Sequence, residues 1–352
     1  MCIMAVSHLP TRLRSYTDQP LGFVSAAEGF VFLSAFVAGG KYFPELAERG
    51  ARYVRGRLWA RALRVYAYHL ALLGFAFTIG AAFAAISGRP GLANLLAFYF
   101  ESPGVALVSG SLLLYQPPLF DILPMYIILL ALSPLVLELA AARGWAAIGA
   151  CALGAWVLAQ VGGRSFIHRL VCGVTGMRLP LDALGAFDLL AWQLLWVAGL
   201  YVGARHARGA LGAPSRRVVG AAALVALVAL AWRHRIGGFA IELGSDAWLD
   251  KWRLGPLRII NFAALALVVA HGLLPALRHL GASLFSLLGR ASLEVFAVHL
   301  LLCSSSLAIV ADDGTLSSLE EAAVLLLTFA AMLLVAWRSR GKRSAVLQPT
   351  AG

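Results

Sequence analysis

Three ionisable side chains at or inside apolar segments, His8, Glu28 and Asp121, are the residues whose types could do chemistry. An ionisable group in an apolar span is costly unless it faces a partner or a wet cavity, so each is a functional candidate. The imidazole of His8 titrates near neutral pH and can accept a proton from a hydroxyl group. We therefore expect acid–base chemistry, with His8 as the general base and the two carboxylates orienting it or binding a polar substrate.

Each of these residues also has a structural interpretation. His8 lies near the end of a short apolar segment and fits a polar cap or a helix interface. Glu28 has small neighbours, and Ser25 and Ser34 can hydrogen-bond to adjacent helices, so a structural ion pair is an alternative. Asp121 stands directly before an apolar run, where a carboxylate can cap a helix N-terminus. The sequence leaves both interpretations open for all three.

A second group of candidates is suited to substrate binding. Asp250 and Lys251 alternate with Trp248 and Trp252, and aromatic faces beside charged groups suit sugar rings. Tryptophan near a membrane surface is also an ordinary anchor, which is the alternative here. The remaining candidates are polar or interfacial residues at or within the apolar segments: Ser25, Ser34, Trp192, Gln193 and Asn261.

Arg64 and His69 form a third group, near the start of the apolar run 63–86. Together with Tyr66 and Tyr68 they could hold a phosphate or carboxylate group that arrives from the cytoplasm, or they could stabilise helix contacts. We assign Arg64 and His69 to binding of a donor substrate.

The elements that position these residues are membrane helices. The chain has 352 residues, of which 61% are hydrophobic and 13% charged, and its mean hydropathy is +0.82. Its apolar runs are often about 20 residues long and rich in Leu, Ala and Val, whereas barrel strands give short alternating segments. We predict an all-α polytopic transmembrane bundle of about ten spans.

The clear apolar runs and the remaining segments divide the chain as follows. Met1–Pro10 covers only about 15 Å of helix and looks like the end of a truncated first helix. Residues 91–115 are interrupted by polar residues and are expected to form a re-entrant or surface element. A single domain is expected over 1–340, with a tail at 341–352. The expected spans are 21–40, 63–86, 119–141, 145–162, 187–204, 218–232, 257–276, 291–310 and 320–337.

Basic residues predict the orientation, because Lys and Arg in short loops stay on the cytoplasmic side. If residues 91–115 cross the membrane either not at all or twice as a hairpin, all three basic regions lie inside and the C-terminus is cytoplasmic. Asp312 and Asp313 then lie outside. The three regions are Arg49, Arg52, Arg55, Arg57, Arg61, Arg64; Arg205, Arg208, Arg216, Arg217; and Arg338, Arg340, Lys342, Arg343.

The net charge of +12 does not predict nucleic-acid binding, because the basic residues lie at the ends of apolar segments. Cys2, Cys151, Cys172 and Cys303 form no CxxC pair, and no histidine cluster has ligand spacing. Neither a disulfide framework nor a bound metal is therefore expected. The sequence predicts no oligomeric state.

Five strings along the chain are familiar as a set: LGFVSAAEGFVFLS at 21–34, FDILPMY at 120–126, AWQLL at 191–195, DKWRLGPLR at 250–258 and LGRASLEVF at 288–296. In this order they closely resemble the OpgC family, and they cover nearly the whole chain. The resemblance implies a multi-pass inner-membrane enzyme related to the acyltransferase 3 group. It also adds Arg258 to the substrate-binding candidates.

Family members are associated with O-succinylation of osmoregulated periplasmic glucans. The resemblance thus implies a periplasmic glycan as acceptor, the lipid bilayer as surroundings, no bound cofactor, and an acyl-CoA, in particular succinyl-CoA, as co-substrate. The family's Asp/Asn-His-Ile/Leu-Pro signature matches Ser7-His8-Leu9-Pro10, with Ser7 in place of the acidic or amide residue. Where the family has Ser-Gly, this chain has Ser34-Ala35.

Two other functions remain as alternatives. A transporter or flippase for an acyl or glycan carrier would use helix breaks and membrane charges equally well, without making a bond. A degenerate, non-catalytic member of the family is the second alternative. A labelled acyl donor distinguishes an enzyme from both, since only an enzyme labels the acceptor.

Overall fold

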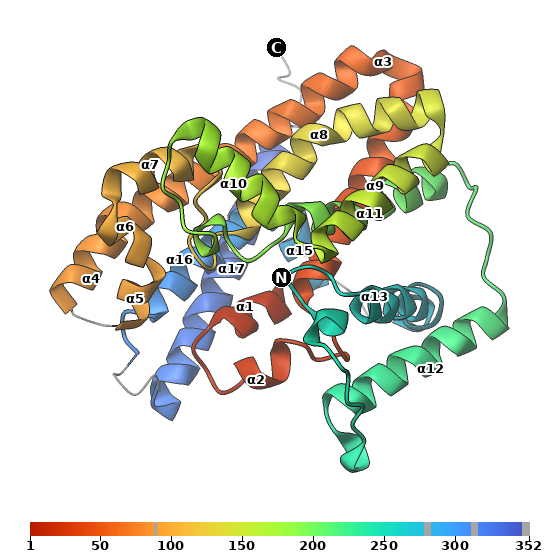
Figure 1. The fold of residues 1–352 in the computed structure, drawn as a ribbon. Helices are drawn as coiled ribbons and strands as arrows, with labels where there is room; N and C mark the ends of the chain where they lie inside the picture. The colour runs from red at the N-terminus through yellow and green to blue at the C-terminus, as the bar shows by residue number, and fades with distance from the viewer. Residues whose placement is uncertain (88–89, 278–282, 311–315, 347–352) are drawn as a thin grey trace. The chain divides into compact units, whose positions relative to one another are not determined.

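The computed structural model describes residues 1–87, 90–277, 283–310 and 316–346 (Figure 1). These ranges form helices and loops and contain no β-strand, so the predicted all-α class is confirmed. Contacts divide the chain into two compact units. The first unit comprises Met1–Asp18, Tyr68–Ala106 and the described residues from Leu277 onward, and the second comprises Gln19–Ala67 and Leu107–Ala276.

Several helices are long and apolar enough to cross a membrane, so the chain is a membrane protein. By length and composition there are five among the described residues, and a sixth if two helices bent by 84° form one span. The five are Ala26–Ser87, Ile122–Arg143, Asp182–Ala207, Pro256–Leu273 and Ser318–Arg340, and the bent pair is Trp145–Gln160 with Gly163–Thr175.

The predicted number of about ten spans is not confirmed, although each expected segment overlaps a helix. Helix α12 (Arg216–Arg233) carries three arginines in its 18 residues. Helix α16 (Ser292–Ser306) has 15 residues and covers about 23 Å of a hydrocarbon core that is about 30 Å thick. The apolar runs in the sequence are therefore longer than some of the helices they form.

The longest candidate span contains a break. Helix α3 (Ala26–Phe75) is continued by the π-helical turn η1 (Ala76–Gly80) and by α4 (Ala81–Ser87), and these 62 residues would measure about 93 Å as one straight helix. Gly50 interrupts α3 with φ 79° and ψ 166°, a conformation open almost only to glycine. The arginine-rich stretch begins at this break, with Arg49 directly before Gly50 and the other arginines after it.

The second unit contains residues 26–67 of α3 and two groups of packed helices. Helices α8 (Ile122–Arg143) and α11 (Leu189–Ala207) both pack against α9 (Trp145–Gln160), and α12 packs against α13 (Pro256–Val268). The shorter elements are α10 (Gly163–Thr175), η2 (Asp182–Leu184), η3 (Ile236–Gly238), η4 (Asp246–Leu249), η5 (Val269–Leu273) and α14 (Leu274–Leu277).

Small residues let α3 and α11 cross closely within this unit. A Cβ atom built on Gly39 or Gly203 would collide with the backbone of the facing helix, and one on Gly199 would collide with Phe32 and Ala35. Such contacts drive helix association in membranes, where apolar burial alone discriminates little between a helix and lipid. Ala35 is fully buried at this crossing.

The second unit has two distinct ends. At one end, which we call the basic end, Trp145 contacts the rings of Phe43 and Tyr201, and the Arg208 guanidinium lies 4.3 Å from the Phe43 ring centroid. At the other end the N-termini of α8, α11 and α13 meet the C-terminus of α9. Hydrogen bonds between their loops and helix ends hold this end together, and Glu28, Asp121, Trp192 and Asp250 lie there.

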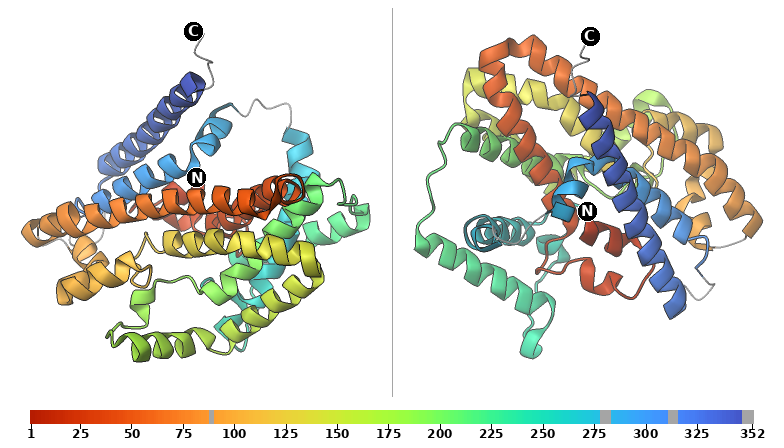
Figure 2. Two further views of the ribbon diagram at one scale, coloured as in Figure 1. Left: turned by 90° about the horizontal axis from the view of Figure 1, so that it is seen from above. Right: turned by 180° about the vertical axis from the view of Figure 1, so that it is seen from behind.

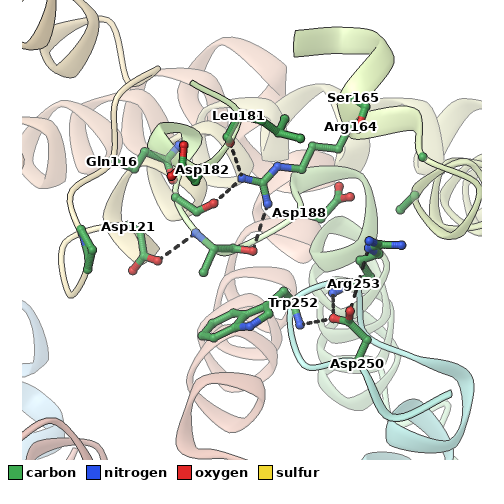
Figure 3. Close-up of a pocket in the computed structure, with 15 residues that line it drawn as sticks. Gln116, Asp121, Arg164, Ser165, Leu181, Asp182, Asp188, Asp250, Trp252 and Arg253 are labelled. Atoms are coloured by element: carbon green, nitrogen blue, oxygen red, sulfur yellow. Dashed lines mark hydrogen bonds and ion pairs between the residues drawn. The ribbon is translucent and has the colours of Figure 1, made fainter. Parts of the chain in front are cut away.

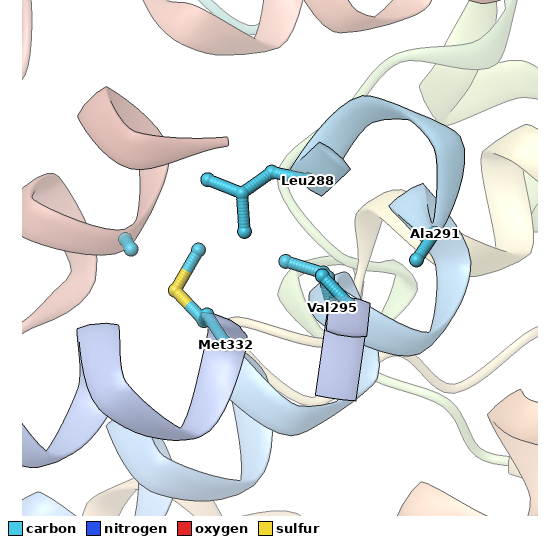
Figure 4. Close-up of a cluster of buried hydrophobic side chains, with 6 residues drawn as sticks. Leu288, Ala291, Val295 and Met332 are labelled. Carbon is cyan, nitrogen blue, oxygen red and sulfur yellow. The ribbon is translucent and has the colours of Figure 1, made fainter. Parts of the chain in front are cut away.

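In the first unit, α1 (Cys2–His8) packs against α16 and α17 (Ser318–Val346), which lie side by side (Figure 2). The remaining helix of this bundle is α15 (Ser283–Arg290), and α2 (Arg14–Thr17) follows α1. A buried apolar cluster joins α1, α15, α16 and α17 (Figure 4). Its members are Ala5, Leu288, Ala291, Val295, Met332 and Ala336. This apolar contact fixes α1, and therefore its last residue His8, against α16.

Residues 91–115 form three short helices, α5 (Pro90–Leu95), α6 (Ala97–Glu101) and α7 (Pro103–Ser111). None is long enough to cross a membrane, which agrees with the interrupted element that the sequence predicts. Helix α17 includes 341–346 of the expected tail. Residues 347–352, and the expected outer residues Asp312 and Asp313, lie outside the described residues.

Candidate functional site

His8, the predicted general base, is stacked on a second histidine in the first unit. The two ring centroids are 5.4 Å apart, and Nδ1 of His8 lies 3.2 Å from Nε2 of His299. His299 is buried on α16, and its Nδ1 lies 2.8 Å from the carbonyl oxygen of Phe296. The packing of α1 on α16 thus joins two imidazoles and a backbone carbonyl through consecutive hydrogen-bond contacts.

These contacts fix the positions of the ring protons when both histidines are neutral. A carbonyl oxygen only accepts, so Nδ1 of His299 carries the proton that is donated to Phe296. Nε2 of His299 is then an acceptor, and Nδ1 of His8 must donate to it. Nε2 of His8 is left as the unprotonated nitrogen, which is the atom a general base needs.

Glu28 lies in a buried network in the second unit. Its Oε1 is ion-paired with Nε of Arg258, and its Oε2 accepts hydrogen bonds from the backbone N–H and the hydroxyl group of Ser25. Both charged side chains are almost completely buried, at 0% and 1% exposure. The structural ion pair considered for Glu28 is therefore present, and its partner comes from the start of α13.

The same network contains two buried N–H groups without a partner among the described atoms. Asn261 accepts the Phe23 N–H through Oδ1 at 2.8 Å, while its Nδ2 has no hydrogen bond. Nη2 of Arg258 also has none. Because these residues are three apart on α13, they share one helix face. A polar ligand or water with acceptor atoms could be held between them.

Asp121 stands at the N-cap position of α8, and its hydrogen bond joins it to a distant loop. Its Oδ2 accepts the N–H of Ala186 at 3.1 Å. Gly185 makes this approach feasible, because it has φ 74° and a Cβ atom there would collide with Asp121 and Gln116. Burial raises the pKa of the Asp121 carboxyl to about 6, against the lowering effect of the Ala186 hydrogen bond.

A cavity of about 650 Å³ opens beside Asp121 at this end of the second unit (Figure 3). Its charged lining residues are Asp121, Arg164, Asp182, Asp188, Asp250 and Arg253, and Gln116 and Trp252 also contribute. Arg164 donates to the carbonyl groups of Leu181, Gly185 and Ala186, so it holds the loop that forms one wall. Asp250 fixes the other wall by accepting the N–H groups of Trp252 and Arg253.

The first unit contains a separate cavity of about 560 Å³ between α3, α16 and α17. Most of its lining is apolar, with Tyr68, Glu294 and Arg338 as its aromatic hydroxyl and charged groups. His69, the neighbour of Tyr68, is fully buried, whereas Arg64 is exposed. Five residues rotate a helix by about 140°, so these two donor-binding candidates lie on different faces of α3.

Comparison with known families identifies the chain. The family described as OpgC protein matches residues 1–343, which is nearly the entire sequence. The chain belongs to the OpgC family. No curated protein and no solved structure matches this OpgC-family chain.

In this OpgC-family protein, the residue that replaces the family's acidic or amide neighbour of His8 does not bind the imidazole. The Ser7 hydroxyl donates to the backbone carbonyl of Met4 at 3.0 Å. The partner that orients Nδ1 of His8 is His299. The OpgC match supports an acyltransferase of the glucan-modifying kind in general.

The other substrate-binding candidates have different surroundings. Trp192 is fully buried and donates to the carbonyl of Trp252, and Gln193 donates to the carbonyls of Ala152 and Leu190. Nζ of Lys251 lies 5.0 Å from the centroid of the Trp252 ring. Ser34, on α3, is half-buried. Trp192 and Gln193 thus support the site by joining elements, while Asp250 lines the cavity itself.

The predicted catalytic residues are divided between the two units. His8 belongs to the first unit, whereas Glu28 and Asp121 belong to the second, where each carboxylate has its own partners. Their joint action on one substrate stays a prediction. Asp188, Arg164 and His299 could not be assigned a role from the sequence, because each shows only a polar side chain at the end of, or inside, an apolar run.

Proposed function

We propose that this protein is an inner-membrane O-acyltransferase that transfers an acyl group, in particular succinyl, from a cytoplasmic acyl-CoA to a hydroxyl group of a periplasmic glucan. Two findings support the proposal. The OpgC family match covers residues 1–343, and His8 has its unprotonated Nε2 selected by the contact with His299. The second of these is the observation that carries the chemistry.

In the proposed reaction Nε2 of His8 removes the proton from a sugar hydroxyl group. The hydroxyl oxygen attacks the thioester carbonyl of the acyl-CoA, the bond from carbonyl carbon to sulfur breaks, and the thiol of CoA leaves with a proton. The products are an ester and free CoA, so atoms and charges balance. A general base of this kind contributes about 10² to 10⁴ in rate.

The contact between the two histidines supports this role in a specific way. Donation from Nδ1 of His8 to His299 holds the ring in one tautomer and one orientation. In many acyl-transfer sites a third side chain orients the histidine base, and that side chain is commonly a carboxylate. Here a neutral imidazole, itself held by the Phe296 carbonyl, takes that position.

The orientation in the membrane is part of the proposal. The basic end of the second unit lies opposite the end that carries Asp121, Glu28 and the 650 Å³ cavity. Since basic loops stay inside, the proposal has the cavity end of the second unit facing the periplasm. The basic residues Arg338 and Arg340 separately favour a cytoplasmic C-terminus by the same rule. The donor-binding role of Arg64 and His69 is retained as a proposal, and the cavity beside Tyr68 and Arg338 supplies a further cationic group in the first unit.

A labelled donor tests the function. Purified protein in lipid vesicles is given succinyl-CoA with a radioactive succinyl group and a glucose oligosaccharide, and the recovered oligosaccharide is counted. The proposal expects label in an ester that mild alkali releases, together with one equivalent of free thiol. A transporter or a non-catalytic protein would give unlabelled oligosaccharide and no thiol, and that result would reject the enzyme.

A further inference from the structure

We infer that the cavity of about 650 Å³ in the second unit is a binding site for a neutral sugar, with Asp188 and Gln116 accepting its hydroxyl hydrogens and Trp252 covering its ring. This inference deepens the proposed function, because it names where the acceptor binds. It rests on the second unit alone and on none of the histidine contacts.

Buried acceptors without a donor are the main argument. Asp188 is 2% exposed, and its Oδ2 has no hydrogen bond, while its Oδ1 caps α11 by accepting the N–H of Leu190. The Oε1 atom of Gln116, another lining residue, is also buried without a donor. A buried acceptor that lacks a donor is costly, so the site is completed by a ligand that brings O–H groups.

Among the described residues no donor is bonded to these two acceptors. Arg164, a strong donor on the cavity wall, instead gives three hydrogen bonds to the carbonyls of Leu181, Gly185 and Ala186. Figure 3 shows these bonds directed into the 181–186 loop, and the Arg253 backbone N–H bound to Asp250. The cavity is therefore rich in acceptors, which suits a ligand with many hydroxyl groups.

The charge and arrangement of the lining residues argue against two other classes of ligand, anions and metal ions. Four carboxylates, from Asp121, Asp182, Asp188 and Asp250, face two guanidinium groups, so an anion is disfavoured. Among the described residues no group of three His, Cys, Asp or Glu side chains is arranged to hold a metal ion. A neutral polyol fits both constraints.

Trp252 supplies the flat apolar face that a sugar ring needs. Its side chain is 40% exposed, and its position is fixed by several contacts. Its ring packs edge to face on Phe187, its carbonyl accepts from the indole of Trp192, and its N–H is bound by Asp250. A volume of about 650 Å³ is within the ordinary range of pockets that hold small ligands.

Equilibrium binding without an acyl donor tests this site. Protein in a phosphocholine detergent, which has no sugar headgroup to compete, is titrated with cellotetraose or laminaritetraose in a calorimeter. Asp188→Asn keeps the cap of α11 but removes the second acceptor, and Trp252→Ala removes the ring. Each should weaken binding by about tenfold or more. Thermal unfolding of each variant establishes that it is folded.

The chain offers a matched control in the same loop. Asp246 is an exposed carboxylate of η4 that does not line the cavity. Asp246→Asn should leave the dissociation constant for the tetrasaccharide within twofold of that of the unchanged protein, which corresponds to about 0.4 kcal/mol at most.

Three results would overturn the inference: no binding of either tetrasaccharide, unchanged binding by both cavity variants, or an equal loss of binding in the Asp246→Asn control. Each is distinguishable from failure of the proposed function. A protein that binds sugar normally but never acylates it would contradict the enzyme alone, and an active enzyme with unchanged binding in the cavity variants would contradict this site alone.

Discussion

Nδ1 of His8 lies 3.2 Å from Nε2 of His299, and this contact links two helices that are nearly 300 positions apart in the chain. The second imidazole is held in turn by the Phe296 carbonyl. The protein therefore orients its proposed base with a neutral group rather than with a carboxylate. A neutral partner stabilises an imidazolium less than a carboxylate does, which makes position and tautomer its main contribution.

Replacement of His299 tests whether it positions His8. His299→Phe keeps a ring beside His8 but removes the acceptor for Nδ1, and acyl transfer should fall on the order of 10²-fold. His299→Gln supplies a carbonyl acceptor and should recover part of the loss. The pH dependence of kcat/KM should also shift in His299→Phe, which a merely structural change would not cause. Equal activity of the two variants would contradict the positioning role.

Asp121 should make stability depend on pH. Its pKa is raised from 3.8 to about 6 by burial, while the unfolded chain keeps the ordinary value. Between these values the folded protein binds more protons than the unfolded one, so stability falls as pH rises from about 4 to about 6. The ionised carboxylate then costs at most about 3 kcal/mol, at about 1.4 kcal/mol per pKa unit.

Asp121→Asn removes this cost and can still accept the Ala186 N–H. Its unfolding temperature in detergent should exceed that of the unchanged protein at pH 8, and the difference should nearly vanish near pH 3.5, below both pKa values of the Asp121 carboxyl. Asp246→Asn, an exposed carboxylate of the same unit, serves as the control and should change neither value. If the advantage of Asp121→Asn were the same at both pH values, the buried carboxylate would not be its cause.

The class of fold could be predicted because apolar runs report helices directly, but the number of spans could not. Where a run ends is set by packing and by local breaks, as at Gly50 in α3, and those depend on the rest of the chain. Site residues show the same limit. Glu28 was expected to have a charged partner or a wet cavity, yet nothing local indicates that Arg258, 230 positions away, is the partner.

Asp121 and Trp192 illustrate what local patterns miss. The position of Asp121 before an apolar run correctly marks the start of α8, but its hydrogen bond goes to Ala186 in a loop that only tertiary structure brings near. Trp192 looked like an interfacial residue and is fully buried, where it supports the more exposed Trp252. Residue type alone does not separate a supporting tryptophan from one that a ligand can reach.

The Glu28–Arg258 pair should matter to stability as a pair. Arg258→Met leaves a buried carboxylate with only Ser25 as partner and should destabilise the protein by about 3 to 5 kcal/mol. Adding Glu28→Leu to that variant should restore most of the loss, because no uncompensated charge then remains. Chemical unfolding of both single variants and the double variant gives the coupling. Strictly additive losses would show that the two side chains do not depend on each other.

The crossing of α3 and α11 should tolerate no added methyl group. A Cβ atom on Gly203 would collide with the Phe36 carbonyl and the Gly40 nitrogen, so Gly203→Ala should lower the unfolding temperature. Gly220 on α12 has open space around it, and Gly220→Ala should be neutral or stabilising by up to about 1 kcal/mol. Thermal scans of the two alanine variants make the comparison, and equal effects would refute the close crossing.

The most direct test of the central claim is the rate at which folded His8→Ala protein transfers succinyl to a glucose oligosaccharide. This rate is compared with that of the unchanged protein and with that of His234→Ala, a control that replaces an exposed histidine. The proposed role of His8 predicts a loss of about 10² or more in His8→Ala and full activity in His234→Ala. Transfer by His8→Ala at the rate of the unchanged protein would contradict it.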